Sequence, residues 1–455
     1  MKVEAVSQPR LKGGERDANR RIFNTAAMLA VLTLAVKIAS MAKEMIVAAW
    51  FGTGDEMDAF LIALLLPSYV INVIAGSLNA ALIPTQIETR ERFGDPAARR
   101  LFQSVSALNG GMLFLATLLL ALAAPFVLPY LCSGFSPEKM ALTQHLFVVL
   151  LPCVALMGLV TNWEALLNSC ERFGLPAIAP AAVSVGTLSV IWICGSQWGI
   201  YALAAGTLAG MAVQLVLLGR SLKQLGFAIL PAWHGMDASV KRVIGQYLPM
   251  IAGSVLFCST ILVDQAMAGT LPPGSVSTLN YGNKLVALAV GVGSTALGTA
   301  VLPYFSKMTA QGDWRGVRHT LKTYTWLILL VTVPATAAGI YLSRPMVGML
   351  FQRGHFTVED TLAVSWVQQM YFLQIPFNSL SLLYVRMISS LKGNGIVMWG
   401  ALLGFCMNVL LNFALMRVMG VAGLALSTSL VYLFMVLYTA IMLLRCLRKA
   451  EEGRL

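Results

Sequence analysis

Residues 199–219 read G-I-Y-A-L-A-A-G-T-L-A-G-M-A-V-Q-L-V-L-L-G and contain no charged side chain. A helix needs about 20 mostly apolar residues to cross a bilayer, so this stretch predicts a membrane-spanning helix. The rest of the chain is similar, since 58% of its 455 residues are hydrophobic and only 11% are charged. Soluble domains carry about 25% charged residues. This composition excludes a soluble fold and predicts a polytopic membrane protein.

Apolar runs of similar length recur along the whole chain. They predict an all-α polytopic membrane protein with about twelve transmembrane helices. Several runs exceed one bilayer thickness, which indicates tilted helices or helices that extend beyond the lipid. The first six runs are 24–50, 57–84, 101–131, 140–168, 175–195 and 199–219, and the second six are 243–268, 276–303, 320–342, 358–385, 395–415 and 419–444.

The basic residues predict the orientation of these helices, because cytoplasmic loops of membrane proteins are enriched in Lys and Arg. If the N-terminus is cytoplasmic, most of the 32 Lys and Arg residues fall in the two tails and the even-numbered loops. The odd-numbered loops then hold Lys139, Arg344, Arg353 and Arg417. We therefore expect a multi-pass protein of the bacterial inner membrane with both termini cytoplasmic. The net charge of +12 is interpreted as a signal of orientation and not of nucleic-acid binding.

The two sets of six helices resemble each other in sequence. G-I-Y-A-L-A (199–204) matches G-V-A-G-L-A (420–425), and E-R-F-G (171–174) matches K-G-N-G (392–395). Because each set has an even number of helices, both halves must have the same orientation, as in two-bundle transporters with a substrate site between the bundles. We expect a cytoplasmic tail (1–21), a six-helix bundle (22–220), a cytoplasmic linker (221–242), a second six-helix bundle (243–445) and a cytoplasmic tail (446–455), with a central cavity between the two parallel-related bundles.

Motifs for covalent chemistry are missing from the sequence. It has no G-x-S-x-G, no G-x-x-x-x-G-K-[ST] and no H-E-x-x-H. The seven cysteines are far apart and the four histidines lack ligand spacing, so we expect no metal and no cofactor. The chain is therefore not expected to be an enzyme. Its energy source would be an ion gradient, the membrane potential or the substrate gradient.

A few charged side chains interrupt the apolar runs. A charge at the middle of a membrane helix costs roughly 2.5–3.5 kcal/mol on insertion scales, so each one needs a partner or a function. Lys37 and Glu44 lie two helical turns apart on nearly one face, whereas Lys43 points roughly 120° away. Asp58 begins the second run, where a carboxylate also stabilises the helix dipole. The alternative to a ligand site is that these residues form structural ion pairs and caps.

Other polar residues lie deep in apolar runs. Glu164 in the fourth run is one turn before Asn168, which favours a structural pair. Asp264 lies near the end of the seventh run. Asn408 and Asn412, one turn apart in the eleventh run, are expected to join helices by hydrogen bonds.

A polar stripe is predicted on the eighth helix. Its residues follow the spacing i, i+3, i+4, i+7 and therefore share one face, which must contact protein or water. An ammonium group beside a cavity suits an anionic ligand such as a pyrophosphate. Together with the charges above, the stripe predicts a substrate-binding site of Lys37, Lys43, Glu44, Asp58, Ser277, Asn280, Tyr281 and Lys284.

Several stretches resemble a known family. K-I-A-S-M-A-K-E-M-I-V-A-A-W-F-G-T-G-D-E-M-D-A-F (37–60) is similar to the first helix and loop of the MurJ/MviN lipid II flippases. Further signatures of that family resemble L-P-P-G-S-V-S-T-L-N-Y-G-N-K-L (271–285), A-L-G-T-A-V-L-P-Y-F-S-K (296–307) and L-F-Q-R-G-H-F-T (350–357). The resemblance extends over at least the first ten expected helices.

This resemblance implies a two-lobed flippase of the multidrug/oligosaccharidyl-lipid/polysaccharide exporter superfamily, a divergent twelve-helix member of its family. In such a flippase a cationic central cavity receives the pyrophosphate and sugar while the polyprenyl tail stays in the lipid. Lys37, Lys43 and Lys284 stand where the family carries cavity arginines, Glu44 stands at an acidic position and Asp58 matches the family aspartate. The Arg-Arg and Glu of the family's second helix are replaced here by the neutral residues 71–76, I-N-V-I-A-G.

We therefore expect a flippase that moves a polyprenyl-pyrophosphate-linked saccharide across the inner membrane by alternating access. The saccharide lipid is either lipid II or an exopolysaccharide or O-unit precursor. The expected partners are this glycan, the lipid bilayer and glycan-assembly enzymes. Two alternatives remain, a cation-coupled multidrug antiporter of the same superfamily and a non-transporting membrane scaffold. The surplus of intramembrane lysine argues against the antiporter, which would need an acidic cavity.

Overall fold

The computed structural model describes residues 12–227, 231–391 and 393–451, apart from the side chains of 12–27, 30, 80, 292–304, 306, 307, 310 and 394. The predicted tails, the linker and the stretch 296–307 lie partly outside the described residues. The described residues form helices and no strand. In chain order these are α1 (Lys12–Phe51), α2 (Asp55–Ile71), the π-helix η1 (Asn72–Gly76), α3 (Ser77–Leu131), α4 (Pro137–Leu150), α5 (Pro152–Ser169), α6 (Gly174–Ile178), α7 (Ala181–Trp198), α8 (Ile200–Gln224), α9 (Ala238–Ala268), α10 (Ser275–Ala310), α11 (Trp314–Phe351), α12 (Val358–Phe372), α13 (Gln374–Ser390), α14 (Asn394–Met419) and α15 (Val421–Glu451).

Over the described part of the chain, these helices form twelve consecutive lengths of helix, and each length overlaps one of the twelve predicted runs. The helix from α2 through η1 continues into α3, which breaks at Gly94 (φ 80°), so residues 55–131 provide two lengths. The pairs α4–α5, α6–α7 and α12–α13 each provide one length, and α4 and α5 are bent by 41°. Seven helices of the described chain are long and apolar enough to cross a membrane, or eight with the bent pair. The all-α membrane fold predicted from the sequence is confirmed.

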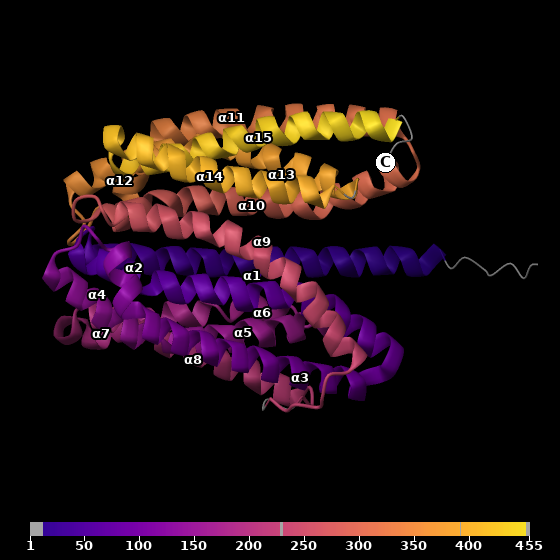
Figure 1. Cartoon of the computed structure of the whole chain (residues 1–455), viewed down its shortest axis with the longest axis horizontal. Helices are drawn as coiled ribbons and strands as arrows, with labels where there is room; N and C mark the ends of the chain where they lie inside the picture. The colour runs from indigo at the N-terminus through magenta and orange to yellow at the C-terminus, as the bar shows by residue number, and fades with distance from the viewer. Residues whose placement is uncertain (1–11, 228–230, 392, 452–455) are drawn as a thin grey trace, which may run out of the picture.

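The helices are arranged in two halves. In Figure 1, α2–α8 form one half and α10–α15 the other, with α1 and α9 between them. The N-terminal part of α9 packs on the first half, since Tyr247 donates a hydrogen bond to the Ile74 carbonyl and Ser77 donates one to Ser254. Farther along, α9 packs on α14 of the second half. Although α9 follows the predicted linker, it therefore contacts both halves.

The matched glycines of the sequence repeat have matching backbone conformations. Gly199, between α7 and α8, has φ 50° and ψ −131°, and Gly420, between α14 and α15, has φ 57° and ψ −132°. Side chains disfavour a positive φ, which explains why glycine occupies both junctions. The two halves therefore turn the chain at corresponding points in the same way.

Helix packing within the first half uses small residues, as is typical of membrane proteins. Gly186 of α7 faces Gly210 of α8 so closely that an added Cβ at Gly186 would lie 2.6 Å from the Gly210 Cα. Large apolar side chains instead cover the outside, including Phe114, Trp192 and Leu330, each more than 70% exposed. This distribution fits a surface that is solvated by lipid and not by water.

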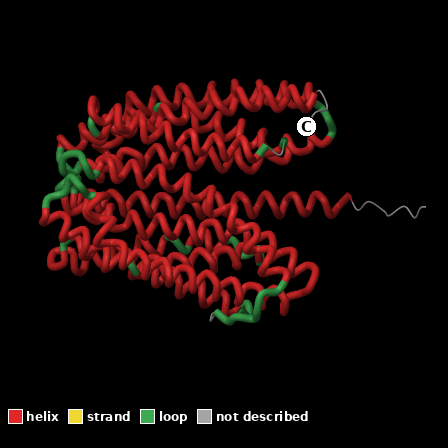
Figure 2. The backbone as a smooth tube through the Cα atoms, viewed as in Figure 1, coloured by secondary structure: helices red, strands yellow, loops and turns green. Residues whose placement is uncertain are grey.

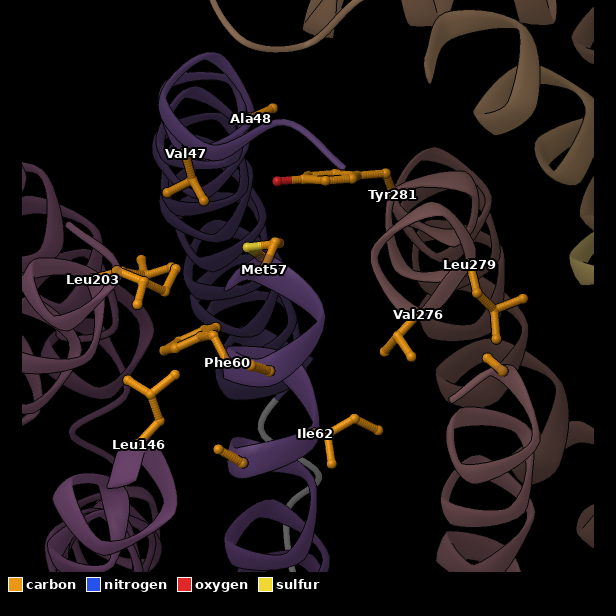
Figure 3. Close-up of a cluster of buried hydrophobic side chains, with 14 of the residues drawn as sticks. Val47, Ala48, Met57, Phe60, Ile62, Leu146, Leu203, Val276, Leu279 and Tyr281 are labelled. Carbon is orange, nitrogen blue, oxygen red and sulfur yellow. The ribbon is translucent and has the colours of Figure 1, made fainter. Parts of the chain in front are cut away.

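The loops gather at the two ends of the molecule (Figure 2). At one end, loops 52–54, 132–136, 269–274 and 352–357 bring the halves together, and we call this the closed end. Its core crosses between the halves, because Val47, Met57 and Phe60 belong to the same buried cluster as Val276 and Tyr281. Figure 3 shows the Tyr281 ring reaching from α10 toward Val47 and Ala48 of α1. The orientation prediction places the closed end on the periplasmic side.

Candidate functional site

A polar cavity lies where α1 of the N-terminal part faces α10 of the second half. Its volume is about 170 Å3, and its polar lining comprises Lys37, Ser40 and Glu44 from α1 and Lys284 from α10. The two-turn spacing of Lys37 and Glu44 puts both side chains on one face of α1, as the sequence predicts. Met41, Ala287 and Leu288 complete the lining.

Glu44 is the centre of the electrostatic network. Its Oε1 lies 2.9 Å from Lys43 Nζ and 3.3 Å from Lys284 Nζ, and the Glu44 residue is only 9% exposed. One carboxylate oxygen is therefore shared by two ammonium groups from different helices. The ion pair Lys43–Glu44 that the sequence offered as an alternative is present. Glu44 lines the cavity, whereas Lys43 is not among the lining residues.

Lys37 differs from the other two lysines. No ion pair joins it to another described side chain, and its Nζ lies 3.8 Å from the position of a Cβ added at Gly291. Lys37, Lys43, Lys284 and Glu44 together carry a net charge of +2 on a site enclosed by apolar helices. Charges in such surroundings are weakly screened, so a mobile anion is attracted to the cavity.

The structure divides the predicted polar stripe on α10. Lys284 lines the cavity, but Ser277 and Tyr281 are fully buried in the closed-end core. The Tyr281 ring packs against Phe351 and Phe356, with centroid distances of 5.3 Å and 5.7 Å. Asn280 is half-buried. Helical spacing correctly placed these residues on one face of α10. It could not show that the start of this face is buried in the core and that only Lys284 reaches the cavity.

Asp58 lies at the closed end and not in the cavity. It is 1% exposed, and its carboxylate accepts hydrogen bonds from the backbone N–H groups of Gly274 (2.8 Å) and Ser277 (2.7 Å). Gly274 precedes the first residue of α10 and has no side chain to cap that helix. Asp58 of the first half therefore supplies the N-terminal cap for a helix of the second half.

Lys139 is a functional candidate that the sequence did not single out. Its Nζ lies 2.7 Å from Asp55 Oδ1 and 2.9 Å from Asp58 Oδ2, and the Phe135 ring centroid is 4.1 Å away. The side chain is only 5% exposed. The available signal was a basic residue in an odd-numbered loop, where basic residues are few, but nothing in the sequence identified its acidic partners.

A second contact at the closed end uses the signature L-F-Q-R-G-H-F-T. The His355 N–H donates to the Ala49 carbonyl at 2.8 Å, and the Thr53 hydroxyl donates to Asp360. Gly52 and Gly354 both have φ +59°, and a Cβ added at Gly52 would lie 2.6 Å from the His355 carbonyl oxygen. The two glycines allow backbone to pack directly on backbone between the C-terminal end of α1 and this loop.

The second half also contains a buried carboxylate away from the lysines. Asp264 of α9 accepts hydrogen bonds from Asn408 (3.1 Å) and Asn412 (2.6 Å) of α14 and from Thr428 of α15. The predicted interhelical role of the two asparagines is confirmed. Asp264 also lines a largely apolar pocket of about 320 Å3. The described residues contain no group of three or more His, Cys, Asp or Glu suited to a metal.

Glu164 has a different partner from the one expected. Gln214 of α8 donates a hydrogen bond to its carboxylate at 3.1 Å, so the contact joins two helices and does not run to Asn168 on the same helix. The packing of α5 against α8 decides this pairing, because it brings the Gln214 amide of α8 to the Glu164 carboxylate of α5.

These observations define a class of protein. Two helical halves meet at a closed end, and a cationic cavity lies between α1 and α10, an arrangement that resembles two-bundle membrane transporters. The family is evident from sequence: the family described as "Lipid II flippase MurJ" matches residues 47–454, and the chain belongs to it.

Individual relatives agree with this membership. The chain is 29% identical over 353 residues to the "Probable lipid II flippase MurJ" of Rhizobium meliloti (strain 1021), covering 76% of this chain and 66% of that protein. It is 27% identical over 450 residues to the protein of the same description from Bdellovibrio bacteriovorus, covering 97% and 84%.

Solved structures support the fold. A structure described as "Lipid II flippase MurJ, inward closed conformation" is similar with a TM-score of 0.77 and 20% identity, covering 94% of this chain and 90% of that one. An inward-facing multidrug resistance MATE family transporter of the MOP superfamily is similar with a TM-score of 0.74 and 12% identity, covering 92% and 98%. The two-bundle transporter architecture is therefore shared beyond the family.

Proposed function

We propose that this chain flips a polyprenyl-pyrophosphate-linked saccharide across the bacterial inner membrane by alternating access. One observation carries this proposal: Lys37 and Glu44 of α1, which packs on α6 and α7 of the first half, line one cavity with Lys284 of the second half. A diphosphate offers several charged oxygens to ammonium groups, and the cavity can receive this group while the polyprenyl chain remains in lipid.

Glu44 supports a specific sequence of contacts. Without substrate, the Glu44 carboxylate satisfies Lys43 and Lys284, so neither ammonium group is left unpaired in a poorly screened site. A diphosphate entering the cavity competes with Glu44 for the same donors. Release on the other side of the membrane returns the lysines to Glu44. The carboxylate therefore limits the affinity for the substrate, which a transporter needs for turnover.

The glycan lipid is proposed to be lipid II, since the relatives that match this chain are described as probable lipid II flippases. An exopolysaccharide or O-unit precursor is the second candidate, because the neutral residues 71–76 replace charged family positions in the second helix. The surplus of positive charge in the cavity favours both over a multidrug antiporter for cationic drugs.

The proposal is tested by complementation of flippase-depleted cells, scored beside a polysaccharide-export defect in the same strain background. Rescue of growth and cell shape supports lipid II, and rescue of export alone supports the second glycan. A purified chain in proteoliposomes should move a fluorescent polyprenyl-pyrophosphate disaccharide between leaflets. A folded protein that rescues neither defect and moves no such lipid would contradict the proposal.

We also propose that both termini are cytoplasmic, that the chain catalyses no covalent step and that glycan-assembly enzymes are its partners. The positive-inside distribution of Lys and Arg supports the orientation. Fusion of a reporter active only in the periplasm to either terminus should give no signal, whereas the same reporter inserted after Ser133 should be active. Affinity capture with the membrane-solubilised chain tests the partners.

A further inference from the structure

We propose that Lys139 is a positioning residue for transport, which continues to hold Asp58 when the two halves separate at the closed end. The inference rests on the proposed alternating-access function, and it concerns a residue outside the cavity. Asp58 could cap the N-terminus of α10 without any side-chain partner. The inference explains why Lys139 is nevertheless buried beside it.

The contacts of Asp58 belong to two different halves. Its two backbone donors, Gly274 and Ser277, lie at the start of α10 in the second half. Its side-chain donor, Lys139, lies on α4 in the first half, 2.9 Å from Asp58 Oδ2. Asp58 itself lies on α2, which packs on α4, and Figure 3 shows Phe60 of α2 close to Leu146 of α4. Asp58 and Lys139 therefore stay together when the halves move apart.

Separation of the halves would remove both backbone donors from Asp58. A carboxylate that loses two strong donors is destabilised wherever water does not replace them, and this would penalise the open state. Lys139 avoids the penalty because it remains hydrogen-bonded to Asp58 Oδ2 in both states. The hydrogen bonds between Asp58 and the start of α10 thus stabilise the closed end, and Lys139 lowers the cost of breaking them.

Asp55 keeps Lys139 in place. The Lys139 ammonium group lies 2.7 Å from Asp55 Oδ1, and the Asp55 side chain is 52% exposed. Because Asp55 is half in solvent, its charge is screened, and it orients Lys139 without competing strongly with Asp58. The Phe135 ring, 4.1 Å from the ammonium group, closes the remaining side.

The experiment measures the separation of the halves at the closed end in the full chain. The seven free cysteines are replaced, and spin labels are attached through the substitutions Ser133→Cys and Glu359→Cys, at two exposed positions on opposite halves. Distance distributions in lipid nanodiscs then give the ratio of closed to open molecules. The variants are Lys139→Met, Lys139→Gln, Lys139→Arg, Asp58→Asn and Asp55→Asn, with the exposed Glu138→Gln as the control.

Lys139→Met should shift the ratio toward the closed form by roughly tenfold, since only the closed form still offers donors to Asp58. Asp58→Asn should shift it toward the open form, and Asp55→Asn should shift it toward the closed form by less than Lys139→Met does, because it loosens Lys139. Lys139→Arg and Glu138→Gln should stay near the unsubstituted chain. Lys139→Gln keeps a neutral donor but loses the charge, so it should shift the ratio in the same direction by a smaller factor, and it makes the test if Lys139→Met fails to fold. A shift of Lys139→Met or Lys139→Gln toward the open form, or no shift, would overturn the inference, because Lys139 would then only support the closed contact.

The distance measurement needs no transported substrate. A chain that shows opposite shifts for Lys139→Met and Asp58→Asn but moves no glycan lipid would refute the proposed function and leave the role of Lys139 intact. If the chain transports the lipid but Lys139→Met shifts the ratio toward the open form, the proposed function stands and the role of Lys139 is refuted.

Discussion

Lys284 of α10 lies 3.3 Å from Glu44 of α1, and this ion pair joins the second half of the molecule to the N-terminal helix within the cavity wall. The two residues are far apart in sequence, and each would be costly in an apolar helix without the other. Under the proposed function, an anionic substrate competes with Glu44 for the Lys284 ammonium group.

Replacement of Lys284 by alanine should reduce transport of a polyprenyl-pyrophosphate glycan by at least about tenfold, which corresponds to roughly 1.4 kcal/mol. The physical reason is the loss of an ammonium group from the half that must hold the substrate opposite α1. Proteoliposome flipping measures the effect, with folded protein confirmed by gel filtration. Lys284→Arg should retain most of the activity because it keeps the charge. Full activity of the alanine variant would remove the substrate-site assignment.

Glu44→Gln should bind the substrate more tightly and turn over more slowly. The substitution releases Lys43 and Lys284 from their shared carboxylate and raises the net charge of the cavity by one, which favours a bound diphosphate over release. Binding of a soluble polyprenyl-diphosphate analogue, measured at several salt concentrations, should increase several-fold at low salt and much less at high salt. Weaker binding by Glu44→Gln would mean that Glu44 organises the lysines and does not compete with substrate.

Gly354→Ala should loosen the contact between loop 352–357 and the end of α1. An added Cβ would overlap the Ala49 carbonyl, and the positive φ of Gly354 adds a conformational cost of about 1 kcal/mol. Gly312 provides a matched control, since it also has a positive φ (+69°) but open space around its Cβ position. Thermal unfolding should show a clearly larger loss for Gly354→Ala than for Gly312→Ala. Equal losses of stability would show that the cost of Gly354→Ala comes from backbone conformation alone and not from the contact with Ala49.

Gly199→Ala and Gly420→Ala should destabilise the protein by similar amounts, on the order of 1–3 kcal/mol each, because the same sparsely populated backbone conformation is required at both junctions. Neither added Cβ would meet an atom within 4 Å, so the cost is conformational. Unfolding of each variant under identical detergent conditions measures the two losses. A large difference between them would argue against equivalent junctions in the two halves.

Periodicity and composition predicted the twelve helical lengths, for reasons seen in particular residues. The run 199–219 has no charge, and α8 (Ile200–Gln224) contains nearly all of it. The helix ends were less accurate, since α1 and α11 extend well beyond the apolar runs, and polar residues outside the lipid can continue a helix without any hydrophobic signal. Lys37, Glu44 and Lys284 were identified because a charge in an apolar helix is conspicuous.

The sequence by itself determined that this chain is a two-fold repeated helical membrane protein with lysines among its membrane helices. Lipid excludes unpaired polar groups, so both the helices and the rare charges are visible in a linear pattern. Only the tertiary structure decided which charges meet. Glu44 pairs with Lys284, Asp58 caps α10 beside Lys139, and Tyr281 packs in the core, because these contacts depend on how helices distant in sequence are packed together. Local periodicity carries no record of that packing.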